Sequence, residues 1–220
     1  MTLTKNEEDY LKMLFHLTVE NDQKKAGTNK LAEHLNVSPA SVNAMLKKLK
    51  IKELVDYQKY GKLQLTAQGK NIAIQLIRKH RLWETFLYQH MNFKWEEVHE
   101  VAEQLEHIKS DKLIEELDKF LGHPQRDPHG AIIPNTNGEY LEVNKMTLAE
   151  IEEGKTCRLV SVKDESAVFL KFVSKIGLSL NSKILVQEVQ AFDQSLTIIF
   201  DKKEETVSHK FATHVFVEEL

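Results

Sequence analysis

The sequence predicts a mainly α-helical protein with a smaller β part, in the order winged helix-turn-helix, helical middle domain and C-terminal small β-barrel. Three observations predict this order. Residues 1–70 hold a capped helix pair followed by two short alternating runs. Residues 71–140 hold long segments with helical apolar spacing, and residues 151–220 hold closely spaced short strands. With 220 residues, the chain is long enough for three small domains, each with its own core.

The first domain is predicted to begin with helices over residues 6–20 and 28–35, followed by a turn and a third helix. Ser38 is a good N-cap for this third helix, because its side chain accepts a free amide hydrogen bond. Pro39 suits the next position, because it lacks the amide that would go unpaired. Helical spacing directs four residues of this helix toward the core: Val42, Met45, Leu46 and Leu49.

The outward face of the third helix is small, polar and basic, which suits a major groove and its phosphates. The hairpin predicted around residues 60–61 is interpreted as a wing that bears Lys59 and Lys62. Residues 1–82 carry 15 basic and 8 acidic side chains, and this net charge of +7 favours a polyanionic partner. The alternative is a surface lysine cluster on an ordinary helical hairpin. The residues predicted to contact DNA are Ser38, Pro39, Ser41, Asn43, Lys47, Lys48 and Lys59.

The middle segment is acidic, with a net charge of −8 over residues 83–150, and is predicted to form helices over 71–90, 95–109 and 111–121. In VHEVAEQLEHIKS (98–110), two histidines and two glutamates fall within about 100° of one helix face. In the preceding helix, His80 and Glu84 stand four residues apart and are expected to be exposed on one side. Imidazole and carboxylate together suit first-row transition metals, and oxygen-rich sets favour Mn²⁺ and Fe²⁺. The alternative is a solvated acidic face. The stripe consists of His99, Glu103, Glu106 and His107.

A homodimer is expected, because the middle helices carry more large apolar residues than one small core needs. These residues are Leu82, Trp83, Phe86 and Leu87. Residues 122–134 are interpreted as a loop and residues 135–150 as a linker.

The cysteine content and the hydropathy of the chain argue against a disulfide-stabilised protein and against a membrane-spanning one. Cys157 is a lone cysteine, so no internal disulfide can form, and it is expected to be a small buried residue in a strand. There is no basic leader followed by an apolar run, and no apolar stretch of membrane-spanning length. The sequence therefore predicts a cytoplasmic protein that does not enter the membrane.

Four motifs stand out along the chain: VSPASVNAMLKKL (37–49), RKHRLWE (78–84), VHEVAEQLEH (98–107) and GHPQRDPHGAIIP (122–134). Together they resemble the diphtheria toxin repressor and manganese transport regulator family of bacterial metal-dependent repressors. The resemblance covers nearly the whole chain. It implies a winged helix-turn-helix, a helical dimerisation and metal-binding domain, and an SH3-like (FeoA-like) C-terminal domain.

The resemblance also implies two metal sites. Acids at positions 9 and 103 are typical of manganese-type members, whereas iron-type members have methionine and cysteine there. Lys12 stands where manganese-type members place a second N-terminal carboxylate, so the chain departs from their two-metal arrangement. Family members often have cysteine where Asp127 stands, and no site is assigned to His123 or His129. The implied ligands are Asp9, Glu103, Glu106 and His107 in the primary site, and His80, Glu84, His99 and Glu165 in the second.

The function that follows is a homodimeric transcriptional repressor of metal homeostasis, with Mn²⁺ or Fe²⁺ as corepressor and a palindromic operator in double-stranded DNA. One alternative is a winged-helix regulator whose DNA binding is independent of metal. The other is a two-metal hydrolase, in which the ions activate water. The hydrolase leaves the winged helix unexplained and lacks a nucleophile or phosphate loop, so we expect no enzyme.

Overall fold

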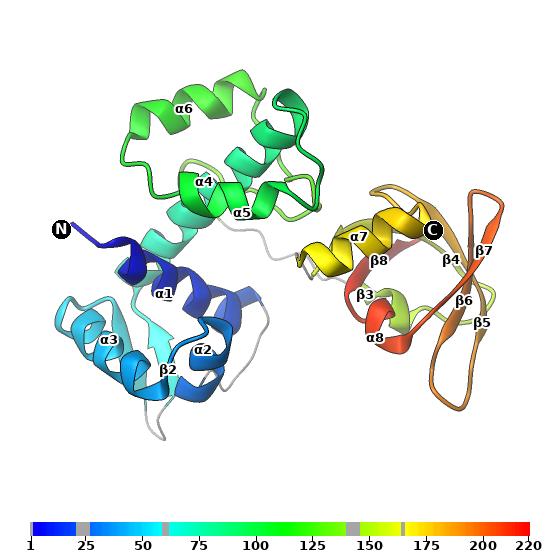
Figure 1. Ribbon diagram of the computed structural model, residues 1–220, viewed down its shortest axis with the longest axis horizontal. Helices are drawn as coiled ribbons and strands as arrows, with labels where there is room; N and C mark the ends of the chain where they lie inside the picture. The colour runs from blue at the N-terminus through cyan, green and yellow to red at the C-terminus, as the bar shows by residue number, and fades with distance from the viewer. Residues whose placement is uncertain (1, 21–26, 59–61, 140–145, 164–165) are drawn as a thin grey trace.

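The computed structural model describes residues 2–20, 27–58, 62–139, 146–163 and 166–220, and it confirms the predicted fold class. Figure 1 shows a helical N-terminal part with a small hairpin, a group of helices at its side, and a separate C-terminal sheet with helices packed on it. Each part has its own buried apolar cluster.

The N-terminal domain is built on three short helices and a two-stranded hairpin. Thr4 forms a capping box with Glu7 that starts the first helix, and Ser38 caps the third by accepting from the amide of Ser41 at 3.1 Å. In the hairpin, Val55 pairs with Leu65 in antiparallel register. The elements are α1 (Lys5–Phe15), α2 (Thr28–His34), α3 (Pro39–Ile51), β1 (Val55–Gln58) and β2 (Lys62–Leu65).

The first helix changes its hydrogen-bond pattern before its predicted end. The α-helical hydrogen-bond pattern stops at Phe15, and residues His16–Glu20 continue as a π-helix, η1. Within this turn the hydroxyl of Thr18 donates to the carbonyl of Leu14 at 2.6 Å, and such side-chain bonds compete with the backbone ladder. The helix predicted over 6–20 therefore reaches Glu20, but its last five residues are π-helical, and Leu17 is buried as its spacing requires.

The middle domain contains α4 (Ala67–His90), α5 (Val98–Leu105) and α6 (Asp111–Phe120). The predicted helix over 95–109 is shorter at both ends, since residues 95–97 form turns and the last α-helical residue is Leu105. Leu82, Trp83 and Leu87 are buried among residues of α5, α6 and Ile133 of the same chain, and Phe86 is partly buried against them. They are therefore not spare apolar surface, contrary to our interpretation. Neither α4 nor any other helix in the described part of the chain is long and apolar enough to cross a membrane.

The C-terminal domain is a six-stranded antiparallel sheet in the order β3-β8-β4-β5-β6-β7. Its first strand and a 3-10 turn, η3 (Leu148–Glu150), lie within the stretch predicted as linker, so the linker is shorter than predicted. A full helix, α7 (Ala167–Ile176), stands between two of its strands in the sequence and begins at the N-cap Ser166. The other elements are β3 (Met146–Thr147), β4 (Thr156–Val162), β5 (Lys183–Val189), β6 (Leu196–Phe200), β7 (Lys203–Val207), α8 (His209–Ala212) and β8 (Val215–Glu219).

Cys157 is fully buried in β4, as predicted. Its burial, together with the smaller effect of the nearby Glu219 carboxylate, raises the pKa of its thiol to about 11. The thiolate is the reactive form, and at pH 8 it would amount to roughly one thousandth of this thiol. We expect native protein to show almost no reaction with Ellman's reagent over the minutes in which guanidinium-unfolded protein reacts completely. Equal rates in the two states would contradict the buried position.

Candidate metal centre

The candidate centre lies where α1 meets α4 and α5, so two domains contribute to it (Figure 1). In α5, Val98 and Ala102 are fully buried against the middle domain, which turns the neighbouring acidic stripe toward α1 and α4. The sequence predicts exposed positions for His80 and Glu84, but these residues are only 4% and 0% exposed. The prediction failed because α1, α5 and the 127–133 segment together cover this face of α4.

The first cluster joins Asp9 of α1 with Glu106 and His107, which follow α5. Nε2 of His107 lies 3.0 Å from Oδ1 of Asp9 and 3.7 Å from Oε1 of Glu106. All three atoms are buried, and no hydrogen bond within the described residues uses them. Since buried polar atoms normally have partners, such a convergence of two carboxylate oxygens and an imidazole nitrogen fits a divalent cation.

Two further features of the first cluster favour a cation. Nδ1 of His107 lies 2.6 Å from a carboxylate oxygen of Glu8 and donates its hydrogen to it. The neutral imidazole then has its lone pair on Nε2, which is directed at the cluster. Burial raises the pKa of Asp9, and the Glu103 and Glu106 carboxylates raise it further, while His107 opposes them. A positive ion would remove this repulsion between carboxylates.

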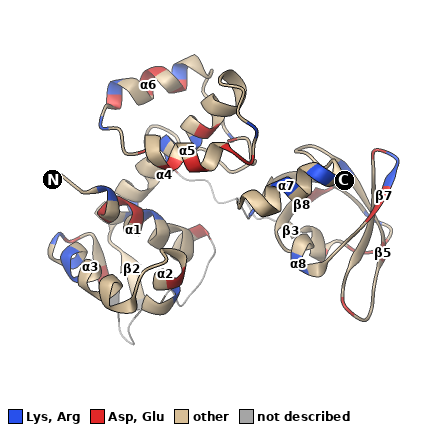
Figure 2. Cartoon of the chain, in the orientation of Figure 1, with Lys and Arg blue, Asp and Glu red and all other residues tan. Residues whose placement is uncertain are grey.

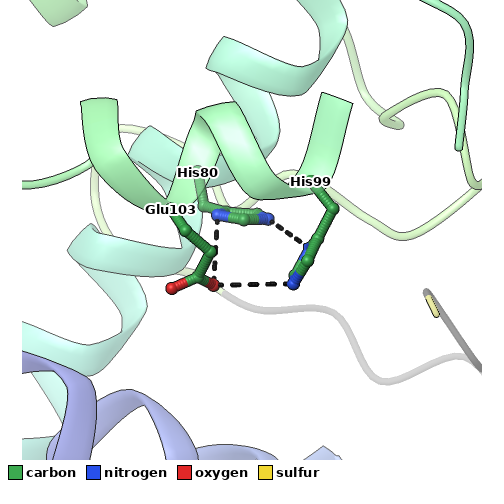
Figure 3. A group of neighbouring side chains, drawn as sticks. All are labelled: His80, His99 and Glu103. Carbon is green, nitrogen blue, oxygen red and sulfur yellow. Dashed lines mark hydrogen bonds and ion pairs between the residues drawn. The ribbon is translucent and has the colours of Figure 1, made fainter. Parts of the chain in front are cut away.

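The second cluster consists of His80, His99 and Glu103, and Figure 3 shows the three side chains directed toward one another. Nε2 of His80 lies 3.2 Å from Nδ1 of His99, and Oε1 of Glu103 lies 3.7 Å from His80 and 3.8 Å from His99. The pKa of His80 is raised: burial lowers it, but Glu84 and hydrogen bonds to carboxylates outweigh burial.

A third cluster, which sequence reasoning missed, joins Glu84 with Asp127 and His129, all fully or almost fully buried. Oε2 of Glu84 lies 3.6 Å from Nδ1 of His129, whose Nε2 donates to the carbonyl of Trp95 at 2.8 Å. Burial would raise the pKa of Glu84, but His80, His129 and His99 hold it well below its usual range. The aspartate and histidine two apart in DPHG were the available signal. That this segment folds onto α4 cannot be read from a sequence.

The third cluster also lies next to the C-terminal domain. The backbone amide of Val162 donates to the carbonyl of His129 at 3.0 Å, and the indole of Trp95 donates to the carbonyl of Leu170 at 3.3 Å. Gly130 has a φ of +83°, and a Cβ there would lie 2.1 Å from the carbonyl oxygen of Val160. Only glycine permits this close approach of the segment to β4.

Lys12 lies between the first and second clusters. Its ammonium donates to Oε2 of Glu106 at 2.7 Å and to Oε1 of Glu103, and lies 3.1 Å from Nδ1 of His80. Burial would lower the pKa of Lys12, but the two carboxylates outweigh burial and raise it, so the side chain stays an ammonium at neutral pH. The structure therefore places Glu103 with the histidines and Lys12, and not directly with Asp9 as the sequence interpretation had it.

The structure brings together seven of the eight predicted ligands, in a different grouping from the predicted one. Oε1 of Glu84 lies 2.9 Å from His80 and 3.4 Å from His99, so this carboxylate bridges the second and third clusters. Glu165 lies outside the described residues.

The predicted DNA-contacting face belongs to α3. Val42, Leu46 and Leu49 are fully buried, and Met45 is partly buried. Figure 2 shows basic positions along α3 and acidic positions at α5. Lys59 lies outside the described residues. The other predicted contact residues are all exposed on α3 or at its start: Ser38, Pro39, Ser41, Asn43, Lys47 and Lys48.

This fold and site define a winged-helix DNA-binding protein with a candidate metal centre between its first helix and its middle domain. Residues 2–63 match the family described as "Iron dependent repressor, N-terminal DNA binding domain", and residues 66–135 match "Iron dependent repressor, metal binding and dimerisation domain". Residues 146–219 match the FeoA domain, as the resemblance implied.

Solved structures and a sequence relative of the same kind resemble the chain. A structure titled "Manganese-dependent transcriptional repressor complex with manganese" is 34% identical, with a TM-score of 0.88 and 97% of this chain and 100% of that chain covered. The manganese regulator SloR is 36% identical, with a TM-score of 0.83 and 99% and 100% covered. The diphtheria toxin repressor of Corynebacterium jeikeium is 32% identical over 127 residues, 58% of this chain.

The chain belongs to the iron-dependent repressor family. Its alignment spans about half of that diphtheria toxin repressor (52%), and 16% of a probable metal transport system membrane protein of Chlamydia trachomatis.

Proposed function

We propose that the protein is a homodimeric transcriptional repressor that binds a palindromic operator when Mn²⁺ or Fe²⁺ occupies its metal centre. The observation that carries the proposal is the origin of the first cluster. Asp9 belongs to the DNA-binding domain, whereas Glu106 and His107 belong to the middle domain. A divalent ion held by all three residues would stabilise only arrangements that keep the two domains together.

The residues present fit such an ion. Asp9, Glu106 and His107 offer three buried atoms that no hydrogen bond from the described part of the chain uses, and the mixture of carboxylate and imidazole suits Mn²⁺ and Fe²⁺. Bound there, the ion supplies charge that offsets the clustered carboxylates. Glu8 orients the imidazole of His107, and Asp9 would connect the bound ion to α1, on which it lies.

Operator recognition would then follow from the arrangement of the two α3 helices in a dimer. Their exposed polar and basic residues would enter the major groove, and half-sites would lie about one helical turn apart or a multiple of it. We propose that the protein works on DNA in the cytoplasm and controls genes of metal homeostasis, and that it catalyses no reaction.

One observation favours a second candidate function, DNA binding that needs no metal. Lys12 of α1 already contacts Glu103, Glu106 and His80, so the two domains are connected without an ion. If these contacts alone set the position of α3, the metal would be dispensable.

The experiment that separates the two functions is a selection of binding sites from a random duplex pool. It is run in parallel with Mn²⁺ and with EDTA, at one fixed salt concentration because salt alone changes affinity by orders of magnitude. We expect a palindrome to be enriched with Mn²⁺ only. The same palindrome at equal enrichment in both arms would establish the metal-independent regulator.

A further inference from the structure

We propose that Lys12 is a built-in cation that takes the place of a second metal ion between Glu103 and Glu106. This inference rests on the proposed metal-binding function, and it concerns how many ions the centre holds and what keeps α1 in place. The first cluster would bind one divalent ion, and the ammonium of Lys12 would balance the remaining carboxylate charge beside it.

The surroundings of the ammonium carry the inference. Lys12 is 7% exposed, and its nitrogen lies within hydrogen-bond distance of two carboxylates and one imidazole nitrogen. Glu103, Glu106 and His80 are the same kinds of ligand that a first-row divalent metal accepts. An ion that bound these three atoms would therefore have to displace the ammonium.

The two carboxylate oxygens of Glu106 are used differently. Oε2 accepts from Lys12 at 2.7 Å, whereas Oε1 points to the first cluster and accepts no hydrogen bond within the described residues. Glu106 would thus bind an ammonium on one side and leave room for one metal ion on the other. A second ion would need Oε2 of Glu106 and Oε1 of Glu103, and Lys12 occupies both.

The same contacts give Lys12 a second role. It lies on α1, and the two carboxylates that accept from it, Glu103 and Glu106, lie on or next to α5, so its charge joins the DNA-binding domain to the middle domain. A lysine ammonium is a compact point charge without coordination chemistry, so it can hold these groups together at any metal concentration. The metal at the first cluster would add a second connection between α1 and the middle domain, beside the one that Lys12 makes.

The test counts bound Mn²⁺ by equilibrium dialysis and records its electron paramagnetic resonance spectrum in wild-type protein, K12Q and K12E. We expect each variant to bind one more Mn²⁺ per chain than wild type. The added ion would share Glu106 with the first, so a spin-coupled pair would replace part of the six-line signal of isolated Mn²⁺. In K12E a new carboxylate stands beside the added ion, so that variant should hold it more tightly.

The matched control is K119Q, which removes an ammonium that pairs with Glu116 at 2.9 Å on the exposed face of α6. It should keep the wild-type Mn²⁺ count and spectrum. If K12Q fails to fold, K12E purified in Mn²⁺ carries the test, because the added ion replaces the lost positive charge. Circular dichroism establishes that each protein is folded.

The outcomes separate the inference from the function on which it rests. Wild-type protein that binds no Mn²⁺ would contradict both. Wild-type protein that binds Mn²⁺, with unchanged counts and uncoupled spectra in both variants, would overturn the role of Lys12 alone. Hydrogen exchange in EDTA tests the positioning role: α1 should lose protection in K12Q while α6 keeps it, and unchanged protection of α1 would overturn that role.

Discussion

Replacing Asp9 with alanine is expected to weaken metal-activated DNA binding by about 5- to 150-fold, the usual range of coupling between two binding sites. Asp9 is the only member of the first cluster that comes from the DNA-binding domain. Without it, an ion on Glu106 and His107 would no longer connect α1 to the middle domain. Fluorescence anisotropy with the selected operator, in Mn²⁺ and in EDTA, measures the change.

The metal-free protein should tolerate the same replacement. Burial and neighbouring carboxylates raise the pKa of Asp9, so folding disfavours its charged form. The charge of Asp9 therefore lowers the stability of the metal-free fold as pH rises through its pKa, and alanine removes that penalty at neutral pH. Glu100→Ala, which removes an exposed acid of α5, is the matched control and should change neither property. Undiminished activation by Mn²⁺ in Asp9→Ala would remove Asp9 from the site.

Much of the fold could be predicted because local chemistry determines it. Ser38 and Pro39 mark the start of α3, and the spacing of Val42, Leu46 and Leu49 identifies its buried face. The end of α1 could not be predicted, since the apolar spacing continues through Leu17 although the hydrogen-bond pattern changes. The spacing of apolar residues indicates which side chains are buried, but it does not indicate whether a backbone amide donates to the carbonyl four residues earlier, as in an α-helix, or five residues earlier, as in a π-helix.

The candidate site was predictable as a set of residues and less so as an arrangement. Helical geometry places the ligands of α5 on one face, but it does not show what lies opposite that face. The buried position of Glu84 depends on a segment more than 40 residues later, where Asp127 and His129 fold back onto α4. The position of Lys12 between Glu103 and Glu106 depends on how α1 packs across α5, which is a property of tertiary structure.

Replacing Glu106 with alanine is expected to lower the free energy of unfolding of the metal-free protein by about 3–5 kcal/mol, the usual cost of breaking a buried ion pair. Glu106 is fully buried, accepts from Lys12 at 2.7 Å and lies 2.5 Å from Nδ1 of His80. Its removal leaves a buried ammonium with less compensating charge. Urea unfolding in EDTA measures the loss, and Glu100→Ala should stay within about 0.5 kcal/mol of wild type, as surface changes usually do.

The double variant Lys12→Met/Glu106→Leu identifies the cause. If the loss in Glu106→Ala comes from the uncompensated ammonium, replacing both partners by apolar side chains should recover most of the stability, because neither charge then remains buried. If the loss comes from a cavity, the double variant would recover no more than Glu106→Leu alone. Mn²⁺ should increase the DNA affinity of neither the double variant nor the single Glu106 variants, since Glu106 also supplies an oxygen to the first cluster. Glu106 would thus stabilise the fold through Lys12 and the regulated state through the metal, whereas Asp9 serves only the latter.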